Sequence, residues 1–281
     1  MKFPFQMVDV FGSDAFSGNP VAVVVATDEI DTAGMQKLAR WFNLSETTFL
    51  LPPRHSDADY RVRIFSLERE LPFAGHPTLG SCHAWLAAGN LPKLPGKIVQ
   101  ECEAGLIAIR RIQTRLAFAA PPLIRFEPPS AAELNEAQCF LGIQPSEIVD
   151  AAWIDNGPGW LGVRLASAER VLSLNPARSW SGRIDIGVVG PHPPGSVEAF
   201  EVRAFFNNHL GMIVEDPVTG SLNAAVAQWL FQSGAVDHDY VAAQGRCLER
   251  NGRIYVSRDD TGQIWIGGDT RTQVEGTLQG F

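Results

Sequence analysis

Val62-Arg63-Ile64-Phe65 recurs in the second half of the chain as Val202-Arg203-Ala204-Phe205. The likeness continues through a His-Pro step at 76–77 and an Asp-Pro step at 216–217. The offset stays at 140 residues (202 minus 62, 217 minus 77) without a gap. An offset close to half of a 281-residue chain indicates duplication of a whole half rather than a small stacked repeat. The sequence therefore predicts two lobes of similar fold.

Each copy also predicts an apolar helix after its proline. No Asp, Glu, Lys or Arg occurs from 77 to 92 or from 217 to 236, and a helix without charges is normally buried. Proline suits the first helical position, which makes His76 and Asp216 the expected N-caps. We predict an α+β fold of two pseudo-symmetric lobes, each with strands wrapped around one central helix. The two helix N-termini are expected to face a common cleft.

Composition and charge exclude several classes of protein. With 45% hydrophobic and 19% charged residues, the chain has the composition of a globular protein. A net charge of −8 (23 minus 31) argues against nucleic acid and anionic membranes as partners. The N-terminus lacks the apolar stretch of a secretion signal. Four scattered cysteines without Cys-X-X-Cys spacing indicate reduced thiols, and hence a cytoplasmic protein.

Paired prolines at 121–122 and 128–129 mark the expected domain boundary, because they break both helices and strand ladders. We expect a linker near 121–130, an N-terminal lobe at 1–120 and a C-terminal lobe at 121–267. Amphipathic or capped patterns predict further helices at 31–42 and at 131–141, the second ended by Gly142.

Glu46, His76 and Asp216 are the candidate catalytic residues, because each ends an apolar element where it could face the cleft. Each also has an ordinary explanation. Asp216 is a common type of N-cap, His76 could be a structural histidine, and Glu46 could be a solvated acid. The duplication favours the functional interpretation, because it places His76 and Asp216 at equivalent helix ends on either side of the cleft.

Helix N-termini with nearby small residues suit an anionic ligand. Unpaired N–H groups and a partial positive charge favour a carboxylate, and Gly75, Gly80, Gly220 and Ser221 let the backbone approach it closely. A small carboxylate is therefore the expected substrate. His76 and His83 lie seven residues apart rather than four, and no cysteine pair accompanies them, so we expect no metal. No dinucleotide fingerprint or nucleophile elbow occurs, so no cofactor is expected.

At these residues the chain resembles the PhzF-like family, named for the phenazine-biosynthesis isomerase. The similarity covers nearly the whole chain. The matching stretches are Gly18-Asn19-Pro20-Val21-Ala22-Val23, Asn43-Leu44-Ser45-Glu46-Thr47-Thr48-Phe49, Arg69-Glu70-Leu71-Pro72-Phe73-Ala74-Gly75-His76-Pro77-Thr78, Glu215-Asp216-Pro217-Val218-Thr219-Gly220-Ser221, Gln244-Gly245 and Gly267-Gly268.

The resemblance implies a diaminopimelate-epimerase-like fold, in which each lobe is a barrel-like, mostly antiparallel sheet and a C-terminal strand, here 268–281, returns to the first lobe. It also implies a cofactor-free homodimeric isomerase. In the phenazine enzyme the residue matching Glu46 moves a proton on a cyclic amino acid, dihydro-hydroxyanthranilate. The residues matching His76 and Asp216 orient this substrate. The remaining matches are implied to bind it, with the backbone holding its carboxylate: Asn19, Gly75, Gly220 and Ser221.

Related epimerases use two cysteines at the cleft. Here Ala74 stands where the first thiol would be, and no cysteine lies between Cys139 and Cys247, which disfavours two-thiol racemisation. Two alternatives to the isomerase stay open at this stage. One is an epimerase or lyase acting on another amino-acid-like substrate, and the other is a non-catalytic protein that binds a small molecule.

Overall fold

A computed structural model describes residues 2–26, 30–208 and 210–279. The chain forms two compact units. Unit 1 consists of Met1–Ala119 and Gly267–Phe281, and unit 2 of Ala120–Ile266. Among the described residues, no helix combines the length and the apolar character needed to cross a membrane.

Unit 1 is built from strands, one surface helix and one central helix. Its elements are β1 (Lys2–Val10), β2 (Asn19–Val25), α1 (Thr32–Phe42), β3 (Glu46–Leu51), β4 (Tyr60–Ser66), β5 (Glu70–Leu71), α2 (Gly75–Ala87), β6 (Lys97–Cys102), β7 (Gly105–Ile112), β8 (Arg115–Ala119) and β18 (Thr270–Gln279).

Unit 2 has a similar composition of elements, with β17 running across the boundary. Its elements are β9 (Arg125–Glu127), α3 (Ala131–Leu141), the 3₁₀ turn η1 (Pro145–Glu147), β10 (Ile148–Asp155), β11 (Leu161–Leu165), α4 (Ala168–Leu172), β12 (Asp185–Pro191), β13 (Phe200–Asn207), β14 (Ile213–Asp216), α5 (Gly220–Gln232), β15 (Tyr240–Gln244), η2 (Arg246–Leu248), β16 (Gly252–Arg258) and β17 (Ile264–Gly268).

The two units repeat one strand topology. In unit 1 the pairs β1–β2, β3–β4 and β6–β7 are antiparallel, whereas β2–β3 and β4–β6 are parallel. In unit 2 the pairs β10–β11, β12–β13 and β15–β16 are antiparallel, whereas β11–β12 and β13–β15 are parallel. Short β5 lies beside β4 as β14 lies beside β13. The predicted pseudo-symmetric α+β fold is confirmed.

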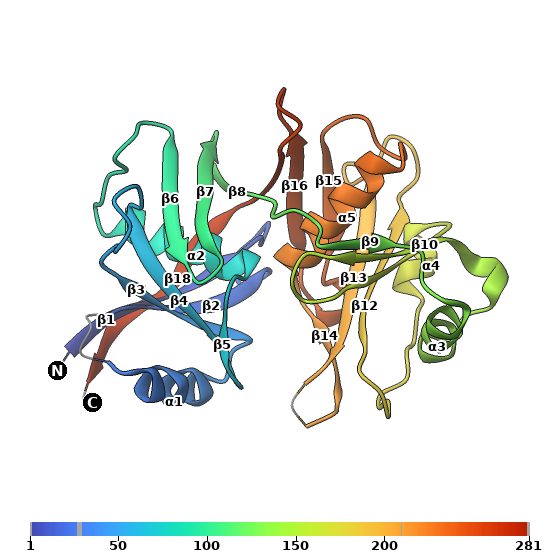
Figure 1. Cartoon of the computed structure of the whole chain (residues 1–281), viewed down its shortest axis with the longest axis horizontal. Helices are drawn as coiled ribbons and strands as arrows, with labels where there is room; N and C mark the ends of the chain where they lie inside the picture. The colour runs from blue at the N-terminus through green and yellow to red at the C-terminus, as the bar shows by residue number, and fades with distance from the viewer. Residues whose placement is uncertain (1, 27–29, 209, 280–281) are drawn as a thin grey trace. The chain divides into compact units, whose positions relative to one another are not determined.

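Each central helix lies across the strands of its own unit (Figure 1). Helix α2 contacts β1, β2, β3, β8 and β18, and α5 contacts β10 and β16. Close packing of the central helices requires glycine at two positions. A Cβ atom on Gly80 of α2 would lie 2.3 Å from the Val21 side chain, and one on Gly187 of β12 would lie 2.2 Å from Leu222 of α5. The uncharged helices are therefore core elements, as their composition predicts.

The predicted N-caps are wrong. Helix α2 begins at Gly75 with Ala74 as its N-cap, so His76 lies inside the first turn. Helix α5 begins at Gly220 with Thr219 as its N-cap, and Asp216 is the last residue of β14. The proline rule failed because Pro77 occupies the third helical position in one unit, whereas Pro217 lies in the turn before the helix in the other.

The hairpin between the repeated strands explains this shift. Phe65 pairs with Glu70, five residues later, whereas Phe205 pairs with Glu215, ten residues later. The second hairpin is thus five residues longer, and beyond it the structural offset is 145 (220 minus 75) rather than 140. By this offset His76 corresponds to Ser221, and Asp216 corresponds to Leu71. The predicted equivalence of His76 and Asp216 is therefore wrong.

In each unit, one further strand pairs with the first strand of the repeated topology, which is β10 in unit 2 and β1 in unit 1. β9 follows β8 in the chain and pairs with β10, and β18 follows β17 and pairs with β1 from Lys2↔Gln279 to Val10↔Thr270. Residues 280–281 of the expected C-terminal strand lie outside the described residues. Most of the expected linker is bound to unit 2. Gln228 donates to the Pro121 carbonyl and accepts from the Leu123 N–H, and 125–127 form β9.

Candidate active site

Glu46 begins strand β3 after the end of α1. Asn43 adopts a left-handed conformation (φ 55°) as the C-cap of α1, which turns the chain towards β3. Glu46 then pairs with Ser66 at the start of the β3–β4 ladder. Its side chain is only 18% exposed. A surface acid does not fit this position, because the carboxylate is largely withdrawn from water.

His76 brings together the predicted residues of unit 1. Its side chain is buried, with Nε2 3.4 Å from Glu46 Oε2. On the other side of the ring, Nδ1 lies 3.4 Å from Asn19 Nδ2. Gly75 precedes His76 as the first residue of α2. Asn19 and Glu46 are each the first residue of a strand, and both thus lie next to His76 in the first turn of α2.

The His76 ring is neutral at physiological pH. Burial lowers its pKa to about 3, and a hydrogen bond with the Pro20 backbone carbonyl opposes this shift only in part. A neutral imidazole has one N–H donor and one acceptor nitrogen. It therefore contacts Glu46 without placing a fixed positive charge beside the carboxylate.

This burial predicts a pH-dependent stability. In the unfolded chain the ring has a pKa near 6.5, compared with about 3 when folded. Between these values the unfolded chain binds an additional proton. The free energy of unfolding therefore rises with pH in this range, and it decreases as the pH falls below about 6.5. The slope from this one group is about 1.4 kcal/mol per pH unit. Urea unfolding at pH 4.5 to 7.5 should show a shallower dependence in His76→Gln than in wild type. Equal slopes would contradict the neutral buried ring.

The loop before Asn19 is held by a buried carboxylate. Asp9 Oδ2 accepts the Ser17 N–H at 3.1 Å, and Oδ1 accepts the Gly18 N–H at 2.9 Å. Gly18 has no room for a side chain, since a Cβ atom would lie 2.1 Å from the Val10 carbonyl oxygen. These contacts fix the entry to β2 and hence the position of Asn19.

The remaining predicted residues form a second group in unit 2. Asp216 ends β14, and Thr219 Oγ1 donates to Asp216 Oδ2 at 2.6 Å. Gly220 and Ser221 are the first two residues of α5, where N–H groups lack partners inside the helix. The Asp216 carboxylate thus lies close in the chain to the first turn of α5, whose N–H groups favour an anion.

Two residues that the sequence did not indicate contact Ser221. The Trp160 indole N–H donates to Ser221 Oγ at 3.2 Å, and Asn156 Nδ2 donates to the Ser221 carbonyl at 2.9 Å. Both come from the turn-rich segment 156–160 between β10 and β11. Its Asn-Gly-Pro-Gly pattern indicates a turn, but no local signal shows that this turn reaches α5.

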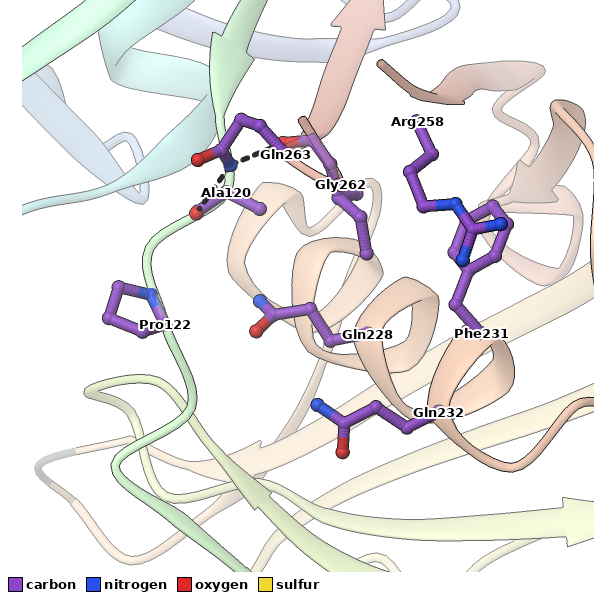
Figure 2. Close-up of a pocket in the computed structure, with 9 residues that line it drawn as sticks. Ala120, Pro122, Gln228, Phe231, Gln232, Arg258, Gly262 and Gln263 are labelled. Carbon is purple, nitrogen blue, oxygen red and sulfur yellow. Dashed lines mark hydrogen bonds between the residues drawn. The ribbon is translucent and has the colours of Figure 1, made fainter. Parts of the chain in front are cut away.

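A groove of about 530 Å³ lies in unit 2 (Figure 2). Figure 2 shows Gln228 and Phe231 of α5 beside it, with the Arg258 guanidinium 4.6 Å from the centre of the Phe231 ring. Gln263, which also lines the groove, donates to the Ala120 carbonyl at 3.1 Å. As far as the described residues go, its lining includes none of the predicted site residues.

Comparison with known proteins identifies the family. The family model for phenazine biosynthesis-like proteins, PhzC-PhzF, matches residues 8–277. Antisense-enhancing sequence 1 of Schizosaccharomyces pombe is 34% identical, over 97% of this chain and 97% of its own length. Trans-2,3-dihydro-3-hydroxyanthranilate isomerase of Pseudomonas fluorescens is 32% identical, over 83% of this chain and 81% of its own length.

A solved structure agrees with these sequence matches. A phenazine biosynthesis protein of the PhzF family from Enterococcus faecalis has a TM-score of 0.80 and 25% identity, over 99% of this chain and 100% of its own. The family match, the relatives and the fold point to one assignment, and the resemblance predicted from the sequence motifs is confirmed. The chain belongs to the phenazine biosynthesis-like (PhzC-PhzF) family, whose relatives include isomerases.

Proposed function

We propose that this PhzF-like isomerase moves a proton between carbon atoms of a small, amino-bearing cyclic carboxylate, with Glu46 as base and then as acid. The Glu46 carboxylate removes a proton from one carbon, and the resulting carboxylic acid returns a proton to another. No atom is gained or lost by the substrate. The observation that carries the proposal is the largely buried Glu46 carboxylate, 3.4 Å from a buried histidine.

The neutral state of His76 supports this two-way role. An imidazolium at 3.4 Å would strongly favour the carboxylate form of Glu46 and oppose its taking up a proton. With a pKa of about 3, His76 carries no such charge at neutral pH. We assign it the role of orienting the substrate through Nε2, which lies 3.4 Å from Glu46 Oε2, with Asn19 at the other ring nitrogen.

The helix starts supply the proposed binding groups. Gly75 in unit 1 and Gly220 and Ser221 in unit 2 present backbone N–H groups of first helical turns, and these are proposed to hold the substrate carboxylate. Asp216 is proposed to bind the substrate amino group, because a carboxylate pairs with a cationic amine.

A two-thiol epimerase mechanism has no support in these residues. Ala74 and Thr219 are the N-caps at equivalent positions of α2 and α5, and neither carries a thiol. Glu46 is thus the best-placed proton carrier among the predicted site residues.

Proton NMR in D₂O tests the proposal directly, with trans-2,3-dihydro-3-hydroxyanthranilate as the substrate. We expect its signals to be replaced by those of an isomer, with hydrogen retained or deuterium incorporated at the receiving carbon. Boiled protein is the control. A substrate that stays unchanged for hours at micromolar protein would refute this substrate assignment. Deuterium entering an amino acid at its α-carbon without isomerisation would favour an epimerase, and saturable binding without any exchange would favour a non-catalytic protein.

A further inference from the structure

A buried glutamine bridges β15 to the turn that carries Asp216. Gln244 is fully buried, and its side chain makes four hydrogen bonds. Oε1 accepts the Thr219 N–H at 3.0 Å and Asn223 Nδ2 at 2.8 Å. Nε2 donates to the Asp216 carbonyl at 3.1 Å and to Thr219 Oγ1 at 2.9 Å. These bonds use the full capacity of a side-chain amide.

The network determines the direction of the Thr219 hydroxyl. The Thr219 backbone N–H can only donate, so the oxygen of the Gln244 amide must face it and the nitrogen must face Thr219 Oγ1. Oγ1 therefore accepts from Gln244. Its one hydrogen is left for Asp216 Oδ2, 2.6 Å away. The bonds thus run in one direction, from Gln244 through Thr219 to Asp216.

Helix capping does not account for Thr219. A threonine at an N-cap ordinarily accepts an N–H of the first turn with its side chain, but Thr219 makes no such bond. The equivalent residue of α2 is Ala74, which has no hydroxyl. The fold of the repeated unit therefore does not require a hydroxyl at this position, and the contact with Asp216 distinguishes the two helix starts.

Gly245 brings the same turn against the end of β15. Its φ is +98°, and a Cβ atom there would lie 2.5 Å from the Pro217 carbonyl oxygen. Both residues of the Gln244-Gly245 pair therefore pack against the segment from Asp216 to Thr219.

We propose that Gln244 and Thr219 are positioning residues that hold the Asp216 carboxylate in the orientation from which it binds a cationic amino group. The inference rests on the proposed role of Asp216 in substrate binding. Loss of the Thr219 hydroxyl would leave Asp216 in place but remove the hydrogen bond that orients its carboxylate, so substrate binding would weaken more than the proton-transfer step.

Two variants of Thr219 provide the test. Thr219→Val removes the hydroxyl, and Thr219→Ser keeps it. Hydrogen bonds to charged groups correspond to about 10- to 100-fold in an equilibrium constant. We expect Thr219→Val to lower kcat/KM for trans-2,3-dihydro-3-hydroxyanthranilate by about this factor, mainly through KM, and Thr219→Ser to stay close to wild type. Titration calorimetry with 3-hydroxyanthranilate cannot report binding of a cation, because its aromatic amine is uncharged at neutral pH. This amine can still donate N–H to Asp216, so the same order of affinities is expected with smaller differences.

A matched control and a double variant separate positioning from general damage. Thr272→Val also removes a bridging hydroxyl, between His83 and Gln6 in unit 1, and should leave kcat/KM unchanged. Asp216→Asn should lower kcat/KM, and adding Thr219→Val should cause little further loss, because Thr219 acts through Asp216. Gln244→Glu is a second way to remove the contact between Thr219 and Asp216, because a carboxylate at position 244 would accept the Thr219 hydroxyl hydrogen in place of Asp216.

The outcomes distinguish this inference from the proposed function. If Asp216→Asn retains wild-type affinity, the proposed role of Asp216 fails. If Asp216→Asn is impaired while Thr219→Val is not, or if the two losses add, the positioning inference is overturned. Equal impairment of Thr219→Val and Thr219→Ser would indicate a steric role and would also overturn it.

A crystal structure of Thr219→Val checks the inference without any substrate. We expect the Asp216 side chain to change rotamer or to become disordered, and an unchanged carboxylate would refute positioning.

Discussion

Glu46→Gln is expected to lower the turnover rate by about 10³-fold, because a glutamine amide cannot take up and return a proton. General acid and base catalysis typically contributes 10²- to 10⁴-fold, and both halves of the proposed reaction use this one group. The amide keeps the size of the carboxylate and can still contact His76, so substrate affinity should change little. Proton NMR in D₂O measures turnover, and titration calorimetry with 3-hydroxyanthranilate measures binding on the same preparations.

Two further variants serve as controls for this result. Glu68→Gln changes an exposed acid in the loop after β4 and should retain the wild-type rate. Glu46→Asp keeps the acid but moves it away from the substrate by one methylene, and should retain a measurable fraction of the activity. A Glu46→Gln protein that turns over substrate within tenfold of wild type would rule out Glu46 as the proton carrier.

Glu215→Gln is expected to destabilise unit 2 by about 3 kcal/mol, because it leaves a buried arginine without its counter-charge. Arg203 makes a bidentate pair with Glu215, at 2.9 and 2.7 Å, and the two side chains are only 7% and 13% exposed. The carbonyls of Val171 and Leu174 also accept from Arg203, which anchors the guanidinium in the interior after the carboxylate is lost.

The repeated unit offers a matched control. Arg63 makes the same bidentate pair with Glu70 on the corresponding strands of unit 1, but these side chains are 22% and 27% exposed. Because water reaches this pair, Glu70→Gln should cost about 1 kcal/mol or less. Urea unfolding of both variants and the wild type gives the comparison, provided that the slopes agree. Equal losses in the two variants would show that burial does not determine the strength of the pair.

Local patterns predicted many of the secondary-structure elements. Helix α1 (Thr32–Phe42) falls within the range 31–42 that its amphipathic pattern predicts, and α3 ends at Gly142 in the left-handed conformation. The uncharged sequences of α2 and α5 predicted burial, because an exposed helix without charges would leave apolar surface in water. Strands β5, β9, β10, β14 and β15 and helix α4 were not predicted from the sequence.

The repeat was recognised from the sequence, but its register was not. Identical residues at an offset of 140 continue past the repeated strands by coincidence, and the five additional residues of the second hairpin become visible only in the pairing of Phe65 and Phe205. Strand pairing decides which residues correspond, because hydrogen bonds between strands join positions that are distant in the chain. The paired Arg63–Glu70 and Arg203–Glu215 ion pairs show the corrected register.

By itself the sequence determined the family, the α+β class, the duplication and the candidate residues, because these depend on motifs and periodicity within short segments. Only the tertiary structure decided which of those residues meet. It joined Glu46, His76 and Asn19 in unit 1, and it joined Asp216 to Thr219 and Gln244 in unit 2. The physical reason is that burial and hydrogen bonding depend on contacts between strands and helices far apart in sequence. No local pattern reports the pKa of a buried histidine or the direction of a threonine hydroxyl.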